Sequence, residues 1–151
     1  MCKEITDARA DVLITGDIAE ADSLLDWLSA LESELACPIY FVLGNHDYYG
    51  GSMRSVRAAV ESRCRDSRYL RWLDQSGVVR LSAAASLVGA GGWADARYGD
   101  YERSGVRLND LNYIHDLIGH DHRTRGHILA SFGDEAASAL ASPLQEAMRQ
   151  L

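Results

Sequence analysis

The sequence predicts an α/β fold on the basis of three observations. Residues 12–14 and 40–43 are two short apolar runs, rich in β-branched and aromatic side chains, as is typical of buried parallel strands. Residues 20–35, which lie between them, have the apolar spacing of a helix. Each run leads into a turn that contains glycine. A strand, a helix and a strand in this order form a βαβ unit, in which the two strands run parallel.

The predicted helix has one apolar stripe, which would cover the sheet. The stripe consists of leucines at helical spacing, namely Leu24, Leu25, Leu28, Leu31 and Leu35. After the two strands, Gly16 and Gly44 let the backbone turn sharply where a Cβ would be penalised. Ligands of such units bind beyond the carboxyl ends of the strands, and Asp17, Asn45 and His46 fall at those ends.

The residue types at the two strand ends suit a site for two divalent metal ions. The Asp17 carboxylate has two oxygens that can bridge two cations, and the Asn45 side-chain oxygen can complete one shell. Two cations roughly 3.5–4 Å apart can activate a water and hold the attacking and leaving oxygens of a phosphoryl group. His46 would protonate the leaving oxygen as a general acid, and Asp47 would orient it through the other ring nitrogen.

Two simpler interpretations stay open. The Asn45-His46-Asp47 triplet can be a plain turn, because Asn and Asp tolerate left-handed backbone and bond to nearby backbone groups. Asp17 alone can be an acid at a helix N-terminus, where the helix dipole favours it. The ordered pair of motifs, each after a strand and with a helix between, favours the metal site.

These motifs resemble those of the calcineurin-like metallophosphoesterases. The pattern of that family runs D-x-H, then G-D, then G-N-H-D/E, then a lone His, then G-H-x-H, each at a strand end. The chain holds the second and third elements, as Gly16-Asp17 and as the tetrapeptide of residues 44–47. Two later tracts, residues 92–95 and 108–110, look like those of a bacterial branch of the family.

The resemblance implies part of a four-layer α/β/β/α sandwich and hydrolysis of a phosphoester at a dinuclear metal centre. It implies that Asp17 bridges two metal ions and that Asn45 binds one of them. His46 is then the leaving-group acid, with Asp47 behind it. The metals would be Mn, Fe, Zn or Mg, because the visible ligands are oxygen donors that do not decide among them. The implied partner is a small-molecule phosphoester.

The other motifs of the family are not found in their usual places. No D-x-H precedes Gly16-Asp17, since residues 1–10 are polar and lack an apolar strand. Residues 133–151 have helical periodicity, and the chain stops there. We therefore expect a single, apparently truncated domain over residues 1–151, with weak or no activity by itself. The alternatives are a non-catalytic binding or regulatory derivative of the fold and a gene fragment without independent function.

A literal match to G-H-x-H occurs at residues 119–122. The stretch before it has helical spacing, with Asn109 or Asp110 as a cap and apolar residues at Leu111, Ile114, Leu117 and Ile118. A turn between helices aims its histidines poorly at metals that lie at strand ends. An exposed turn is therefore favoured over metal binding by His120 or His122, and His115 and His127 are predicted to be surface groups.

The elements predicted for the middle of the chain are a helix over residues 52–64, antiparallel strands over 78–81 and 86–90, and an irregular loop over 91–101. Long irregular loops in compact domains are often functional. Trp93, Arg97 and Tyr98 would either wall a substrate pocket or pack in a covering loop.

Composition narrows the function classes. The net charge of −7 and pI near 5.1 argue against a nucleic-acid surface. A small basic cluster is interpreted as a solvated helix end and not as a phosphate clamp; it comprises Arg63, Arg65, Arg68 and Arg71. Three widely spaced cysteines favour a reduced, cytoplasmic setting. No apolar run has the length of a membrane span or forms a signal-peptide core, and the oligomeric state is not predicted.

Overall fold

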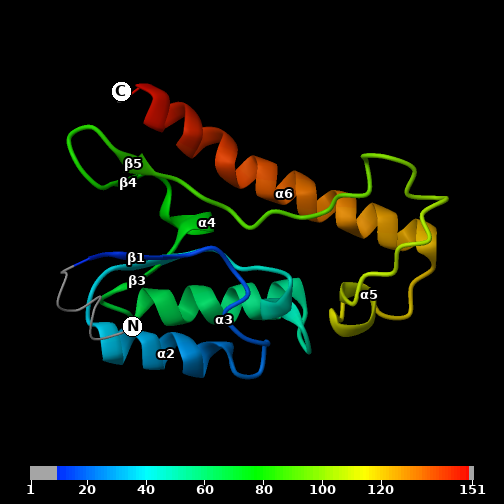
Figure 1. Cartoon of the computed structure of the whole chain (residues 1–151), viewed down its shortest axis with the longest axis horizontal. Helices are drawn as coiled ribbons and strands as arrows, with labels where there is room; N and C mark the ends of the chain where they lie inside the picture. Colours follow the sequence, from blue (N-terminus) through cyan, green and yellow to red (C-terminus); the bar gives the residue numbers. More distant parts are fainter. Residues whose placement is uncertain (1–9, 150–151) are drawn as a thin grey trace.

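A three-stranded parallel sheet organises the computed structural model, which describes residues 10–149 (Figure 1). Its strands are β1 (Val12–Ile14), β2 (Ile39–Phe41) and β3 (Leu70–Trp72), in the order β1-β2-β3. Val12 pairs with Ile39, and Ile39 pairs with Leu70. The predicted α/β class and the parallel pairing of the first two strands are confirmed. The third strand was not predicted, and β2 ends two residues earlier than expected, at Phe41.

Two helices connect these strands and pack on one face of the sheet (Figure 1). Helix α2 (Leu24–Leu35) begins later than predicted because residues 21–23 form a turn. Helix α3 (Met53–Arg65) begins after Ser52, whose side chain accepts the N–H of Ser55 at 3.1 Å in a capping box. The two helices bury the apolar side chains Leu24, Leu28, Leu35, Met53, Val56 and Val60.

The chain then crosses to the other side of the sheet (Figure 1). After β3 come the short helix α4 (Leu73–Ser76) and the antiparallel pair β4 (Val79–Arg80) and β5 (Ser86–Leu87). The predicted hairpin is thus confirmed, with shorter strands. Residues 91–101 contain neither helix nor strand, as expected.

The last two helices differ most from the prediction. Helix α5 (Asp110–Tyr113) is a single turn, because Ile114 has extended backbone and the N–H of His115 bonds to the Gly51 carbonyl at 2.9 Å. Helix α6 (His122–Arg149) starts at residue 122 instead of 133. It contains two internal glycines, Gly126 and Gly133, each of which costs only about 1 kcal/mol in a helix, and the internal Pro143.

The core joins these parts into one body. Side chains of the sheet, α2 and α3 pack with four residues from the later chain, namely Ile114, Leu117, Leu129 and Phe132. Within residues 10–149, no helix is long and apolar enough to cross a membrane. Some residues named in the sequence analysis lie outside the described part of the chain. These are residues 1–9, which include Cys2 and most of the stretch predicted to lack a strand, and residues 150–151, at the end of the predicted C-terminal helix.

Candidate functional site

The candidate site lies where β1 and β2 end, at the same edge of the sheet. Because the strands are parallel neighbours, the loops that follow them leave side by side. The Asp17 carboxylate, from the first loop, accepts the backbone N–H of His46, in the second loop, at 3.2 Å. The structure therefore brings together Asp17 and the Asn45-His46-Asp47 triplet at neighbouring strand ends.

The close approach of the two loops depends on glycine. Gly16 has a φ of 103°, in the region that favours glycine, and Asp17 follows it with a φ of 55°. A Cβ built on Gly44 would lie 2.1 Å from Oδ1 of Asp17. Any side chain at position 44 would thus displace the Asp17 carboxylate.

Asp47 points inward and binds backbone. Its side chain is fully buried, and its oxygens accept the N–H groups of Ile18 at 2.7 Å, Ala19 at 2.9 Å and Gly44 at 2.8 Å. Burial raises the pKa of Asp47, while these three donors act in the opposite direction. Among the described residues Asp47 forms no hydrogen bond to the His46 ring, so its predicted orienting role has no contact to support it and stays a prediction.

His46 is exposed, at the first position of the 3₁₀ turn η1 (His46–Tyr48). Its ring stacks on the Tyr49 ring, with centroids 4.5 Å apart and planes 21° apart. An exposed imidazole beside the Asp17 loop is accessible to a bound substrate. Its position therefore suits the general-acid role that the sequence predicts.

Asn45 belongs to a hydrogen-bonded triad that the sequence did not reveal. Its Nδ2 donates to Oδ1 of Asp110 at 2.7 Å and to the Tyr49 hydroxyl at 3.3 Å. The Tyr49 hydroxyl donates to the same Asp110 oxygen at 2.8 Å. Burial, and next the bond to Asp110, raise the pKa of Tyr49 to about 12, so its hydroxyl keeps its proton. The sequence signals for Asp110 were its position as a helix cap candidate and its place in the tract of residues 108–110, which resembles one in a bacterial branch of the family.

The segment that carries Asp110 is fixed on the chain just after Asn45. The N–H of Gly50 bonds to the Tyr113 carbonyl at 2.8 Å, and the N–H of Met53 bonds to the Asp116 carboxylate at 2.7 Å. The Tyr49 and Tyr113 rings stack with centroids 5.2 Å apart. In Figure 1, α5 accordingly lies beyond the end of α3 at which that helix begins.

The donor set fits part of a divalent cation site. Asp17 offers a carboxylate, and Asn45, whose amide hydrogens face Asp110 and Tyr49, is left with its oxygen for a ligand. Oxygen donors of this kind suit hard divalent cations. Across residues 10–149 there is no group of three or more His, Cys, Asp or Glu side chains that could hold a metal ion. The described residues thus supply two identifiable donors.

The G-H-x-H match lies in an exposed turn that leads into α6, whose first residue is His122, in agreement with the prediction. His120 and His122 are exposed, and the His122 ring stacks on Tyr101 with centroids 4.1 Å apart. Asp121 accepts the N–H of Thr124 at 2.8 Å, a contact that lowers the pKa of Asp121 and caps the helix. His115 and His127 are also exposed.

The loop after β5 packs as a cover and also borders a cavity. The Trp93 ring contacts those of Tyr48 and Phe132, with centroids 5.5 Å and 5.1 Å away. Arg97 pairs with Asp95 and Asp134, which ties the loop to α6. A cavity of about 500 Å³ lies against this loop; its walls include Trp93, Tyr98, Tyr101, Leu108 and Leu129.

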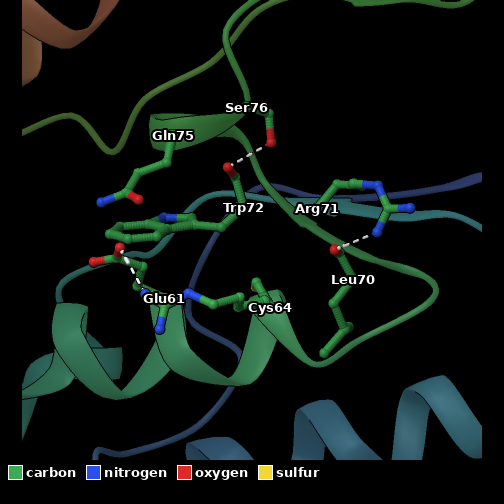
Figure 2. A pocket seen from close by; sticks show the side chains of 8 residues that line it. Glu61, Cys64, Leu70, Arg71, Trp72, Gln75 and Ser76 are labelled. Carbon is green, nitrogen blue, oxygen red and sulfur yellow. Dashed lines mark hydrogen bonds and ion pairs between the residues drawn. The ribbon is translucent and has the colours of Figure 1, made fainter.

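A second cavity, of about 370 Å³, lies between α3, β3 and α4, and none of the candidate site residues lines it (Figure 2). Its charged groups are engaged within the chain: Arg65 pairs with Glu61, and Arg71 donates to the carbonyls of Leu70 and Arg68. Figure 2 shows the Arg71 guanidinium beside the Leu70 carbonyl, turned away from Trp72. These contacts agree with the interpretation of the basic cluster as a helix end.

Comparison with known proteins gives one match. Neither the curated proteins nor the solved structures gave a significant match. The family model for calcineurin-like phosphoesterases matches residues 3–146, nearly the whole chain. The mixed α/β structure with its parallel sheet and helices is consistent with that family, and the chain belongs to the calcineurin-like phosphoesterase family.

Proposed function

We propose that this chain hydrolyses a small-molecule phosphoester with two divalent cations, one of which is held by Asp17 and Asn45. Phosphoester hydrolysis is the general activity that the family indicates. The observation that carries the proposal is the meeting of the Asp17 loop and the Asn45 loop at one sheet edge, through the bond from the His46 N–H to Asp17. The metals are Mn, Fe, Zn or Mg.

Each side chain of the site has a separate task. When bound, the two cations activate a water and stabilise the phosphoryl oxygens. Asp17 and Asn45 would hold the cations through their side-chain oxygens. His46 gives a proton to the departing oxygen, while the Tyr49 ring limits the orientations of the imidazole. Asp47 holds the two loops together, and we retain it as a candidate catalytic residue.

The setting of this activity is inferred from composition. The net charge of −7 disfavours a nucleic-acid partner, so we propose a small substrate held chiefly by the metals. Cys37 and Cys64 are free, and burial raises the pKa of both thiols. Unpaired thiols suit a reducing compartment, and we therefore propose a cytoplasmic location without a membrane partner.

The test is manganese-dependent hydrolysis of 4-nitrophenyl phosphate and of bis(4-nitrophenyl) phosphate. We expect slow turnover, because a dinuclear centre needs ligands from several strands and residues 10–149 supply two identified donors. Asp17→Ala and Asn45→Ala should remove it. Asp26→Ala is the control, since Asp26 is exposed on α2.

Two outcomes would contradict the proposal. Absence of manganese-dependent turnover on both substrates would favour the alternative, a non-catalytic binding or regulatory derivative of the fold. Turnover that survives Asp17→Ala would show that the catalytic centre lies elsewhere in the protein.

A further inference from the structure

The Asn45 amide is held by two buried groups that no metal motif includes. Asp110 is 8% exposed and Tyr49 is 7% exposed, so both are shielded from water. One Asp110 oxygen accepts two hydrogen bonds, from Asn45 Nδ2 at 2.7 Å and from the Tyr49 hydroxyl at 2.8 Å. The triad is therefore closed, and every one of its donors has a protein partner.

The chemistry of the triad fixes which way the amide faces. One Asp110 oxygen accepts both the Tyr49 hydroxyl and the Asn45 Nδ2, so Asn45 presents its NH₂ group, and not its oxygen, to Asp110. The Tyr49 proton is used on Asp110, which leaves the hydroxyl oxygen to accept the second amide hydrogen. A flipped amide would place two acceptors face to face. The Asn45 oxygen is thus held away from Asp110.

We infer that Asp110 and Tyr49 are positioning residues that hold the Asn45 amide oxygen toward the cation site at Asp17. This inference rests on the proposed function, because it takes Asn45 as a cation ligand. Tyr49 has a second contact in the site, since its ring stacks on His46. Outer partners of metal ligands fix ligand orientation in this way and contribute to affinity.

The test compares Mn²⁺ affinity in wild type, Asp110→Ala, Asp110→Asn and Tyr49→Phe, measured by the EPR signal of free Mn²⁺. Asp110→Ala should weaken binding roughly 10- to 100-fold, the range for lost outer partners of a ligand. Asp110→Asn keeps the shape and one acceptor oxygen, and Tyr49→Phe keeps the ring stack, so both should show smaller losses. Circular dichroism checks that each variant is folded.

A double-mutant cycle separates positioning from general damage. If Asp110 acts through Asn45, Asp110→Ala should add no further loss of Mn²⁺ affinity in an Asn45→Ala background. Asp116→Ala is the matched control, because Asp116 ties the same segment to Met53 but does not contact Asn45. It should bind Mn²⁺ like wild type. In the metal-free protein, Asp110→Ala should also shift the Asn45 side-chain amide signals in a ¹⁵N spectrum.

Each remaining outcome has a definite meaning. Unchanged affinity in Asp110→Ala, or an equal loss in the Asn45→Ala background, overturns the inference but leaves the proposed hydrolysis standing. If Asp110→Ala weakens Mn²⁺ binding only when Asn45 is present, but the wild type shows no turnover, the inference is supported and the proposed hydrolysis is contradicted. A wild-type chain that binds no Mn²⁺ overturns both.

Discussion

The backbone N–H of Ile18 donates a 2.7 Å hydrogen bond to the side chain of Asp47, so a residue from the second motif supports the loop of the first. Three consecutive residues of that motif face three directions. Asn45 is half-buried against Asp110, His46 is exposed, and Asp47 is fully buried. The motif thus combines the proposed metal ligand, the proposed general acid and a structural tie within one turn.

Asp47→Ala should destabilise the protein. The change removes the acceptor of three backbone N–H groups and leaves them without a partner. We expect the free energy of unfolding in urea to fall by about 3 kcal/mol. Asp22 is exposed in the turn of residues 21–23, so Asp22→Ala should leave the free energy of unfolding near that of the wild type. Wild-type stability with reduced turnover would instead support a direct catalytic role for Asp47.

Gly44→Ala should disturb the Asp17 carboxylate. The new methyl group would lie 2.1 Å from Oδ1 of Asp17, so one of the two loops must shift. We expect a loss of about 1–3 kcal/mol in unfolding free energy, together with weaker Mn²⁺ binding. Gly105→Ala is the matched control, since a Cβ there meets nothing within 4 Å. If the two variants had the same unfolding free energy and the same Mn²⁺ affinity, this would argue against the close packing of the two loops.

His46→Ala should slow the hydrolysis of poor leaving groups more than that of good ones. General-acid assistance matters most when the departing oxygen is basic. With manganese present, we expect a loss of about 100-fold for phenyl phosphate and about 10-fold or less for 4-nitrophenyl phosphate. His127→Ala, an exposed histidine on α6, provides the control. A uniform loss across leaving groups would assign His46 to binding and not to proton transfer.

Glu32→Gln should make the free energy of unfolding less dependent on pH in the acidic range. Burial acts to raise the pKa of Glu32, but hydrogen bonds from Ser67, Arg63 and the Tyr69 N–H outweigh it and leave the pKa below the ordinary value of 4.5. The ionised form therefore stabilises the fold above about pH 4.5, and this contribution is lost as the pH falls through the lowered pKa.

At pH 7 the Glu32→Gln variant should lose roughly 2 kcal/mol of unfolding free energy, and the difference from wild type should shrink toward pH 3. Urea unfolding across pH 3–7 would measure it. Glu34→Gln, exposed on the same helix, should show little change. A difference that grows on acidification would contradict the proposed contacts of Glu32.

Local sequence patterns were sufficient to predict the strands and the helix that bury apolar side chains. Leucine spacing located α2, and the apolar runs located β1 and β2. Strand β3 was missed because the charged Arg71 separates its two apolar residues, Leu70 and Trp72, so that no apolar run marks a buried strand. The start of α6 was missed because Gly126 and Gly133 weaken the helical pattern there.

The site was predictable only where its residues stand in short sequence motifs that directly follow a strand. Asp17, Asn45 and His46 stand in ordered motifs, and the structure places them at adjoining strand ends. The bond between Asn45 and Asp110 joins residues 65 positions apart, and no local pattern encodes such a pair. The inward direction of Asp47 likewise depends on backbone donors from another loop.

The docking of Asp110 against Asn45 also bears on the order in which the molecule folds. The βαβ unit closes through contacts of short sequence separation, whereas the triad must bring together chain segments separated by 65 residues. Closing the longer loop carries a larger entropic cost, and such contacts form late. A chain emerging from the ribosome would therefore complete both motifs before the Asn45 amide has a fixed orientation, and metal affinity would mature only after Asp110 has been added.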